Sequence, residues 1–198
     1  MLDDPRLAAL HGAFEGRPAK RAPRDAASRE AAVALLLRAR ADLEILLIKR
    51  AVRETDPWSG HMALPGGRRS PEDADLLATA WRETHEEIGV RLDRVGTFLG
   101  ALDEVAPRSP RLPPIVIAPF IASVPPDTAA VADPREVEAA LWVPLAALRD
   151  EGAVDELVLE LEGGRRVFPS FRYGEHVIWG LTHRILEQFL TVAAEAGL

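Results

Sequence analysis

The chain has 198 residues, of which 47% are hydrophobic, and it contains no cysteine. This length suits one domain with a sizeable core, and the lack of cysteine excludes disulfides, thiolate nucleophiles and zinc-thiolate centres. The 31 acidic residues outnumber the 24 basic ones and give a formal charge of −7, which argues against nucleic-acid and membrane-surface partners.

The N-terminal residues lack the features of a secretion signal. Residues 1–4 carry neither a basic region nor an apolar stretch, and no apolar run approaches the roughly 20 residues that span a bilayer. We therefore expect a cytoplasmic protein. Residues 1–30 are polar, with a short helix expected over 5–14, and they predict an N-terminal arm over a single domain at residues 31–198.

Short apolar runs predict a series of strands after the arm. The first two, 33–38 and 43–50, are nearly continuous in apolar residues and form a buried hairpin. The later expected strands are 95–102, 115–124, 138 or 139–143, 157–161 and 165–168. A proline-rich loop separates 95–102 from 115–124, and such long loops usually carry specificity.

Two helices complete the expected order in the C-terminal part. A short one follows Pro144, over 144–148. The last helix should cover one face of the sheet with an apolar stripe at helical spacing, which consists of Ile178, Leu181, Ile185, Phe189 and Val192.

The segment between the strands 43–50 and 95–102 carries the most informative motif. Pro65 is followed by Gly66 and Gly67, which permit unusual backbone angles and close approach of a ligand. A helix then carries the run RETHEEIG at residues 82–89. Ser70, before Pro71, is a candidate N-cap, with Asp73 and Asp75 as alternatives, and Gly89 ends the helix.

Three glutamates of that helix lie at spacings i, i+3 and i+4. Glu83, Glu86 and Glu87 therefore gather on one face. The apolar stripe of Leu77, Trp81, Thr84 and Ile88 points elsewhere, so we expect the glutamates to line a concave or open surface. Three like charges repel one another, whereas Mg²⁺ or Mn²⁺ prefers such oxygen ligands. Arg82 lies four residues before Glu86, where it could fix that carboxylate.

Basic and aromatic residues near the motif are candidate substrate contacts. Arg50 and Arg53 could bind a phosphate, and Trp58 could stack on a base or line the pocket mouth. Arg68, beside the glycines, could steer an anion toward them. The alternative is equally open, namely that the arginines are solvated and that Trp58 packs under its own loop.

The motif resembles the Nudix box of Nudix hydrolases. The match runs from Gly67 to Val90 and is one residue longer than the standard box, with Glu72 or Asp73 in the place of the isolated acidic residue. The extra residue, the stretch 46–51 and the LPGG run at 64–67 are similar to the coenzyme A pyrophosphatase branch. The run HVIWGLT at 176–182 also resembles the start of that branch's last helix.

This resemblance implies an α/β fold, an α/β/α sandwich with a mixed central sheet, the catalytic helix on one side and the C-terminal helix on the other. It implies Mg²⁺- or Mn²⁺-dependent hydrolysis of the pyrophosphate bond of a nucleoside diphosphate derivative. The substrate that the resemblance favours is coenzyme A or acyl-coenzyme A. Glu86 and Glu87 would bind the metal with a main-chain oxygen of Gly66 or Gly67, and Glu83 would be a metal ligand or the base. Homodimers are frequent in the family, so we list one as an expectation.

Several alternatives stay open at this point. Other family members take the base from a distant loop, so Glu104, Glu136 and Glu138 are candidates. The chain departs from the branch pattern at Ile48, at Leu64 and in the spacing before Gly60. These departures favour a second hypothesis, hydrolysis of ADP-ribose, NADH, a dinucleoside polyphosphate or a nucleoside triphosphate. A third is a module that binds a nucleotide without catalysis.

Overall fold

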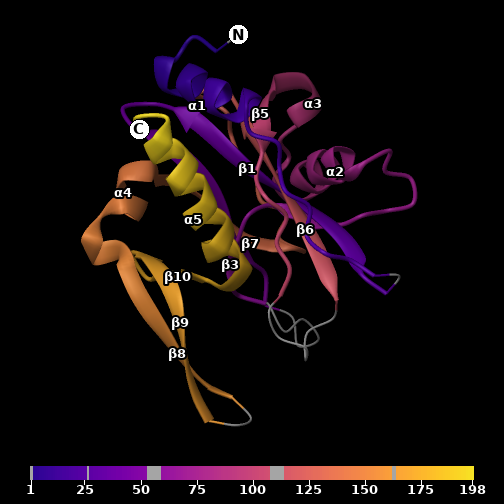
Figure 1. Ribbon diagram of the computed structural model, residues 1–198, viewed down its shortest axis with the longest axis vertical. Coiled ribbons are helices and arrows are strands. Elements are labelled where there is room, and N and C mark those ends of the chain that lie inside the picture. The colour runs from indigo at the N-terminus through magenta and orange to yellow at the C-terminus, as the bar shows by residue number, and fades with distance from the viewer. Residues whose placement is uncertain (1, 26, 53–58, 108–113, 162–163) are drawn as a thin grey trace.

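A mixed sheet between two helical layers forms the body of the computed structural model, which describes residues 2–25, 27–52, 59–107, 114–161 and 164–198 (Figure 1). The strand order is β3-β2-β1-β6-β5, with β4 beside β1 and β7 beside β2. These strands are β1 Arg29–Ala39, β2 Leu43–Arg50, β3 Met62–Ala63, β4 Gly66–Arg68, β5 Thr97–Ala101, β6 Ile115–Ser123 and β7 Val137–Pro144. Only the β1–β6 pairing is parallel among these described strands.

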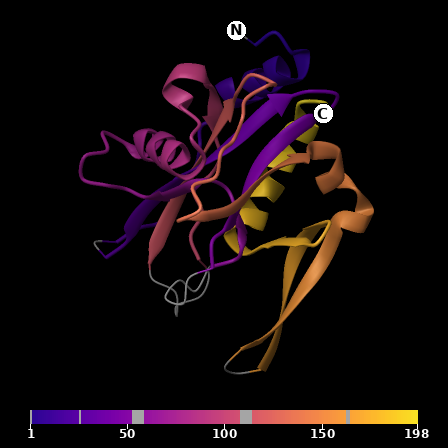
Figure 2. The same cartoon turned by 180° about the vertical axis from the view of Figure 1, so that it is seen from behind.

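The helices and a second, three-stranded sheet surround this body. The helices are α1 Pro5–Glu15, α2 Leu76–Ile88, α3 Leu92–Val95, α4 Leu145–Arg149, the 3₁₀ turn Glu151–Ala153 and α5 Gly180–Glu195. The second sheet, ordered β10-β9-β8, consists of β8 Val154–Leu161, β9 Gly164–Tyr173 and β10 His176–Trp179. Figure 2 shows from behind that the β8–β9 hairpin projects away from the main sheet.

Alternation along β1 explains the two-sided sandwich. Successive side chains of a strand point to opposite faces. Leu35 and Leu37 belong to a core cluster that includes α1 and α5, whereas Ala34 and Leu36 belong to a second cluster that includes α2. Helix α2 and helix α5 therefore cover opposite faces of the sheet (Figure 1), which confirms the expected fold class.

Several predicted boundaries were wrong, two of them for identifiable reasons. Strand β1 begins at Arg29 rather than residue 33, because its polar start pairs with β6, Arg29 opposite Ile115. The last helix begins at Gly180, and Ile178 lies on β10 instead of the helix. The run at 176–179 pairs with β9 across a turn at Gly174 (φ +57°), and Gly180 (φ +67°) then separates strand from helix.

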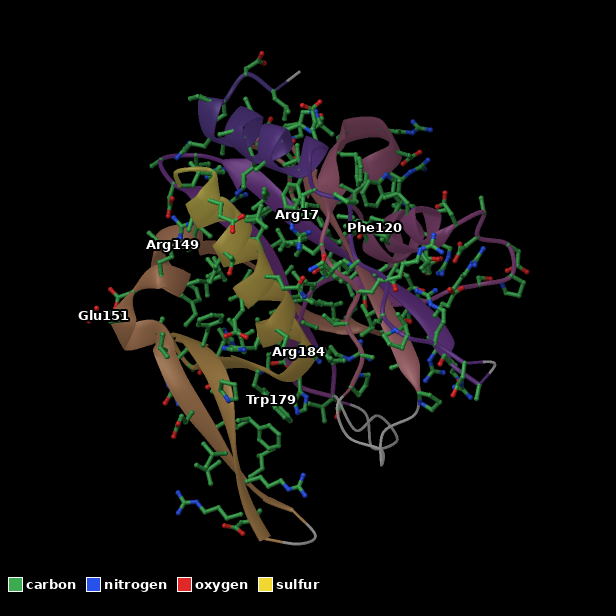
Figure 3. The ribbon with its side chains drawn as sticks, in the orientation of Figure 1. Arg17, Phe120, Arg149, Glu151, Trp179 and Arg184 are labelled. Carbon is green, nitrogen blue, oxygen red and sulfur yellow. The ribbon has the colours of Figure 1, made fainter. Side chains whose placement is uncertain are left out.

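The N-terminal residues contribute to the core rather than only covering it. Asp4 caps α1, and the helix buries Leu7, Leu10 and Phe14 in the same cluster as α5. Arg17 then extends under α1 to donate to Asp103 Oδ1 at 2.9 Å (Figure 3). Whether residues 1–30 are an arm and residues 31–198 one domain stays a prediction. None of the helices in the described part of the chain has the length and apolar composition of a bilayer-spanning segment.

Replacing Leu10 with alanine should destabilise the fold strongly. The Leu10 side chain is fully buried among α1, α5 and the sheet. We expect Leu10→Ala to lower the free energy of unfolding by about 2–5 kcal/mol, because such a change leaves a cavity. Urea denaturation followed by circular dichroism measures it. The control is Val52→Ala, whose side chain is 76% exposed and which should change stability by less than about 0.5 kcal/mol. Equal effects of the two substitutions would contradict the docking of α1.

Candidate active site

Helix α2 is capped later than the serine-proline pair suggested. The N–H of Ala78 donates to Asp75 Oδ1 at 2.8 Å, which makes Asp75 the N-cap, one of the predicted alternatives. At the other end Gly89 has φ +71°, and its N–H donates to His85 O at 2.9 Å. Ser70, Pro71 and Asp73 lie in the loop before the helix, and none of them caps it.

Asp73 instead holds Arg82 in a two-bond ion pair. Arg82 Nε donates to Asp73 Oδ1 at 2.9 Å, and Nη2 donates to Oδ2 at 3.0 Å. The same Oδ2 accepts from Ser70 N at 2.8 Å and from the buried Thr79 hydroxyl at 2.9 Å. The Arg82 guanidinium, helped by these donors, holds the pKa of Asp73 well below its usual range. Asp73 rather than the exposed Glu72 is therefore the acidic partner of the arginine.

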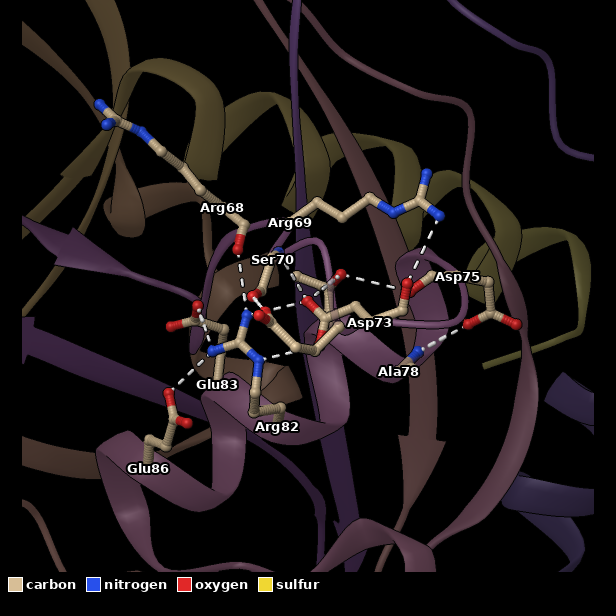
Figure 4. A network of polar contacts seen from close by, with 11 residues as sticks. Arg68, Arg69, Ser70, Asp73, Asp75, Ala78, Arg82, Glu83 and Glu86 are labelled. Atoms are coloured by element: carbon tan, nitrogen blue, oxygen red, sulfur yellow. Dashed lines mark hydrogen bonds and ion pairs between the residues drawn. The ribbon is translucent and has the colours of Figure 1, made fainter.

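The other edge of the Arg82 guanidinium contacts two of the motif glutamates. Nη1 lies 2.8 Å from Glu86 Oε2 and 2.8 Å from Glu83 Oε1. Nη2 also donates to the carbonyl oxygen of Arg68 at 3.1 Å. Figure 4 shows this network, in which one guanidinium links the loop, the strand β4 and the helix. Hydrogen bonds to Asp73 and Glu83 and the negative charge of Glu86 raise the pKa of Arg82, so its guanidinium stays charged.

Gly66 and Gly67 let β4 lie close to both β1 and helix α2. Gly66 has φ +152°, and a Cβ there would lie 2.3 Å from the carbonyl oxygen of Ala32 on β1. A Cβ at Gly67 would lie 2.4 Å from the carboxylate of Glu83. Any larger residue at these positions would push the strand from the sheet or the glutamate from the strand.

Glu87 is the buried member of the motif. The residue is only 2% exposed, and its Oε2 accepts a hydrogen bond from Gly66 N at 2.8 Å. Burial raises the pKa of Glu87 to about 8, and the negative charges of Glu83 and Glu136 add to the rise. Burial also raises the pKa of Glu83, against the effect of Arg82. The expected open surface is therefore correct for the exposed Glu86 and wrong for Glu87.

The apolar stripe of α2 also differs in part from the expected one. Thr84 and Ile88 are buried, whereas Leu77 and Trp81 are half-buried, and Trp81 packs against Phe98 and Phe120. The fully buried Thr79 and Ala80 were missed. Thr79 carries the hydroxyl that bonds Asp73, so it has a polar reason to face inward that hydrophobic spacing does not reveal.

The motif supplies hard oxygen donors for a divalent cation. In the part of the chain that is described, no three histidine, cysteine or acidic side chains are already grouped as metal ligands. Glu83 and Glu86 bond Arg82, and Glu87 bonds Gly66. The donor set itself fits Mg²⁺ or Mn²⁺, because several carboxyl groups, among them the buried Glu87, lie beside a glycine backbone that admits close approach.

The predicted substrate contacts fall into two groups. Arg50 ends β2, and its charge lowers the pKa of Glu87, so it lies within electrostatic reach of the motif. Arg68 is exposed, and its guanidinium extends away from Arg82 in Figure 4. Arg53 and Trp58 lie outside the described residues.

The three distant glutamates have different partners. Glu104 accepts from Ala22 N at 2.8 Å and pairs with Arg24, so it holds the N-terminal segment. Glu138 pairs with Lys49 at 2.7 Å. Glu136 differs from both, because its charge raises the pKa of Glu83 and of Glu87. Of the three, Glu136 is the one that acts on the motif.

Sequence reasoning missed a cavity of about 510 Å³ on another side of α2. The N-terminal segment, the start of α2 and strand β6 line it, with Arg21, Arg24, Leu77 and Phe120 among its residues. The motif glutamates are not part of its lining.

Known proteins share sequence and fold with this chain. The model of the NUDIX domain matches residues 22–161. The chain belongs to the Nudix family. An uncharacterized Nudix hydrolase NudL of Cronobacter sakazakii is 31% identical over 161 residues, which cover 81% of this chain and 80% of that protein. An uncharacterized protein of Schizosaccharomyces pombe is 43% identical over 107 residues, but the match spans only 32% of its length and 52% of this chain.

Solved structures show the same Nudix fold at low sequence identity. A MutT/nudix family protein from Enterococcus faecalis has a TM-score of 0.59 at 20% identity, covering 95% of this chain and 70% of its own. The NUDIX domain of Shewanella oneidensis NrtR, complexed with ADP ribose, has a TM-score of 0.56 at 19% identity, covering 88% and 91%. With the family match and the hydrolase relatives, the chain is a Nudix hydrolase, an enzyme for pyrophosphate-containing substrates.

Substitution of Asp73 by asparagine should weaken the fold in a pH-dependent way. The folded-state pKa of Asp73 is depressed, so its carboxylate stabilises the protein above the unfolded-state pKa of about 3.9, and this contribution is lost as the pH falls below that value. We expect Asp73→Asn to lower the free energy of unfolding by about 1–3 kcal/mol at neutral pH, toward the lower figure because Arg82 is partly solvated.

Urea denaturation at about pH 7, 5 and 3.5 measures this difference, which should narrow only below about pH 4. Glu72→Gln, at the exposed neighbour, is the control and should change stability by less than about 0.5 kcal/mol. A difference between wild type and Asp73→Asn that stays constant over the whole pH range would show that the ionised carboxylate is not the stabilising group.

Proposed function

We propose that this Nudix hydrolase uses Mg²⁺ or Mn²⁺ to cleave the pyrophosphate bond of coenzyme A or acyl-coenzyme A. One observation carries the metal-dependent part: the buried Glu87 carboxylate bonds Gly66 N while Glu83 lies against Gly67. A diphosphate substrate needs its negative charge neutralised before water can attack, and these carboxylates can hold the cation that does so. The coenzyme A part rests on the resemblance of residues 46–51 and 64–67.

Each motif residue has a distinct part in the proposed reaction. Glu83, Glu86 and Glu87, with the main-chain oxygen of Gly67, would hold the metal. A bound Mg²⁺ neutralises phosphate oxygens and lowers the pKa of a water. Arg82 is the positioning residue, because its pairs with Asp73, Glu83 and Glu86 restrict the carboxylates to few rotamers.

Residues around the motif would bind substrate and move the proton. Arg50, whose charge acts on Glu87, is suited to a phosphate oxygen of the substrate, and the exposed Arg68 to drawing the anion toward β4. Arg53 and Trp58 are further candidates from the sequence. For the general base we favour Glu136 over Glu104 and Glu138, with Glu83 as the alternative, since Glu136 has both Glu83 and Glu87 in its field.

A substrate panel tests the specificity. The purified protein is incubated with Mg²⁺ and coenzyme A, ADP-ribose, NADH, dinucleoside polyphosphates and nucleoside triphosphates, and products are separated by chromatography. Coenzyme A should give 3′,5′-ADP and 4′-phosphopantetheine. Turnover of another substrate without coenzyme A cleavage would reject the branch assignment. ADP-ribose is the alternative to watch, because the NrtR domain of similar fold is complexed with it. A cytoplasmic location and a homodimer stay predictions from the sequence.

Neutralising the buried carboxylate should abolish most activity. We expect Glu87→Gln and Glu83→Gln each to lower kcat/KM on the order of 100-fold or more, because each removes an anionic metal ligand. Steady-state kinetics and calorimetric titration with Mg²⁺ measure the losses. Glu72→Gln makes the same change in the nearby loop and should leave both intact. If Glu87→Gln binds nucleotide normally and changes no activity, the non-catalytic module would be the better account.

A pair of substitutions at the start of β7, one just before the strand and one on it, distinguishes the general base. Glu136→Gln should lower kcat about 100-fold with little change in Mg²⁺ affinity, since general bases contribute about that much. Glu138→Gln, two residues away and paired with Lys49, should stay within about 3-fold of wild type. Unchanged kcat in Glu136→Gln would return the role to Glu83.

A further inference from the structure

Three aromatic rings meet where the two sheets join, and we call this group the aromatic junction. It consists of His61, Phe168 and Trp179. The ring of Trp179 lies 5.1 Å from that of His61 and 5.4 Å from that of Phe168, measured between centroids. His61 directly precedes β3 of the main sheet, whereas the other two belong to β9 and β10. The junction therefore draws on both sheets.

Strand register places two of these rings on one face. Trp179 lies opposite Ser170 in the antiparallel β9–β10 pair, and Phe168 is two residues before Ser170. Residues two apart on a strand share a face, and diagonal neighbours on paired strands are within reach of aromatic side chains. Trp179 also immediately precedes α5, so the start of that helix fixes its backbone (Figure 3).

Neither of the two described rings that contact Trp179 stacks on it. Its planes make angles of 65° with His61 and 57° with Phe168, so both neighbours meet it at an edge or a tilt. No other aromatic ring pairs with Trp179 within the described residues. All three rings are only half-buried, unlike the fully buried Phe189 of the core. A planar group could therefore stack on Trp179.

The backbone connects this junction to the motif glutamates. Arg50 N donates to His61 O at 3.0 Å, and Gly60 N donates to Arg50 O at 3.1 Å, so Arg50 and His61 are neighbours across the β2–β3 ladder. The charge of Arg50 acts on Glu87. From His61 the chain passes through β3 to Gly66, whose N–H bonds Glu87. His61 of the aromatic junction thus lies close along the chain to Gly66, the residue that bonds Glu87.

We propose that the aromatic junction binds the nucleobase of the substrate, with Trp179 as the ring on which the base stacks. This inference rests on the proposed function and assigns a binding site to the nucleobase of the substrate. Stacking on an aromatic ring tolerates any base, and a purine offers the larger overlap. Arg50, whose N–H donates to His61 O, would contact the diphosphate next to the base.

Tryptophan fluorescence tests this base site independently of catalysis. Adenosine should quench the emission of the wild-type protein, and ribose 5-phosphate, which has no base, should not. The quench should persist in Trp142→Phe, because that ring lies on β7 under the Arg38 guanidinium, 4.1 Å away. It should disappear in Trp179→Phe, while calorimetry shows adenosine still bound. A quench of wild-type size in Trp179→Phe would overturn the proposal.

Kinetics give the second readout. Trp179→Ala should raise KM about 5- to 100-fold with a smaller change in kcat, because base stacking is lost. Trp179→Phe keeps a ring for stacking, so its KM should lie close to that of wild type. If KM of Trp179→Ala equals that of wild type, the base site is wrong and the hydrolase proposal stands. If no substrate is turned over but the quench still depends on Trp179, the hydrolase proposal is wrong and the base site stands. Should Trp179→Ala not fold, Trp179→Phe alone decides by its fluorescence.

Discussion

The guanidinium of Arg82 is the interaction on which the candidate active site depends. It bonds Asp73 on one side, Glu83 and Glu86 on the other, and the carbonyl of Arg68 from β4. Without it, carboxylates within one turn of α2 would repel one another and the loop before the helix would lose its main polar anchor. A planar group with five donors can satisfy all these partners at once, which a lysine could not.

The second constraint is the close approach of β4 to α2. Gly66 and Gly67 have no side chain, so β4 can pair with β1 and also lie against the carboxyl groups of Glu83 and Glu87. Glu87 is consequently shielded from water, and its proton affinity rises. The fold thus places a carboxyl group where its ionised form is costly, a situation that functional sites tolerate and that stability alone disfavours. Cation binding there would offset this cost.

Several helices and strands could be predicted from the sequence, because they depend on local residue patterns. The β2 strand, the short helix after Pro144 and the helix carrying the glutamates follow from apolar runs, spacing and caps. The rest depends on partners far along the chain. Ile178 has helical spacing, yet its segment pairs with β9. Asp75 caps α2, whereas Asp73, another candidate, bonds Arg82. Burial of Glu87 follows from β4, which no helical wheel includes.

The parallel pairing of β1 with β6 has a consequence for how the chain folds. Arg29 lies opposite Ile115, so the entire motif segment intervenes between the two central strands. Contacts between distant parts of a chain form slowly, because loop closure costs entropy before any pairing rewards it. On the ribosome, α2 would emerge well before β6, so Trp81 could pack against Phe120 only after synthesis has passed the middle of the chain.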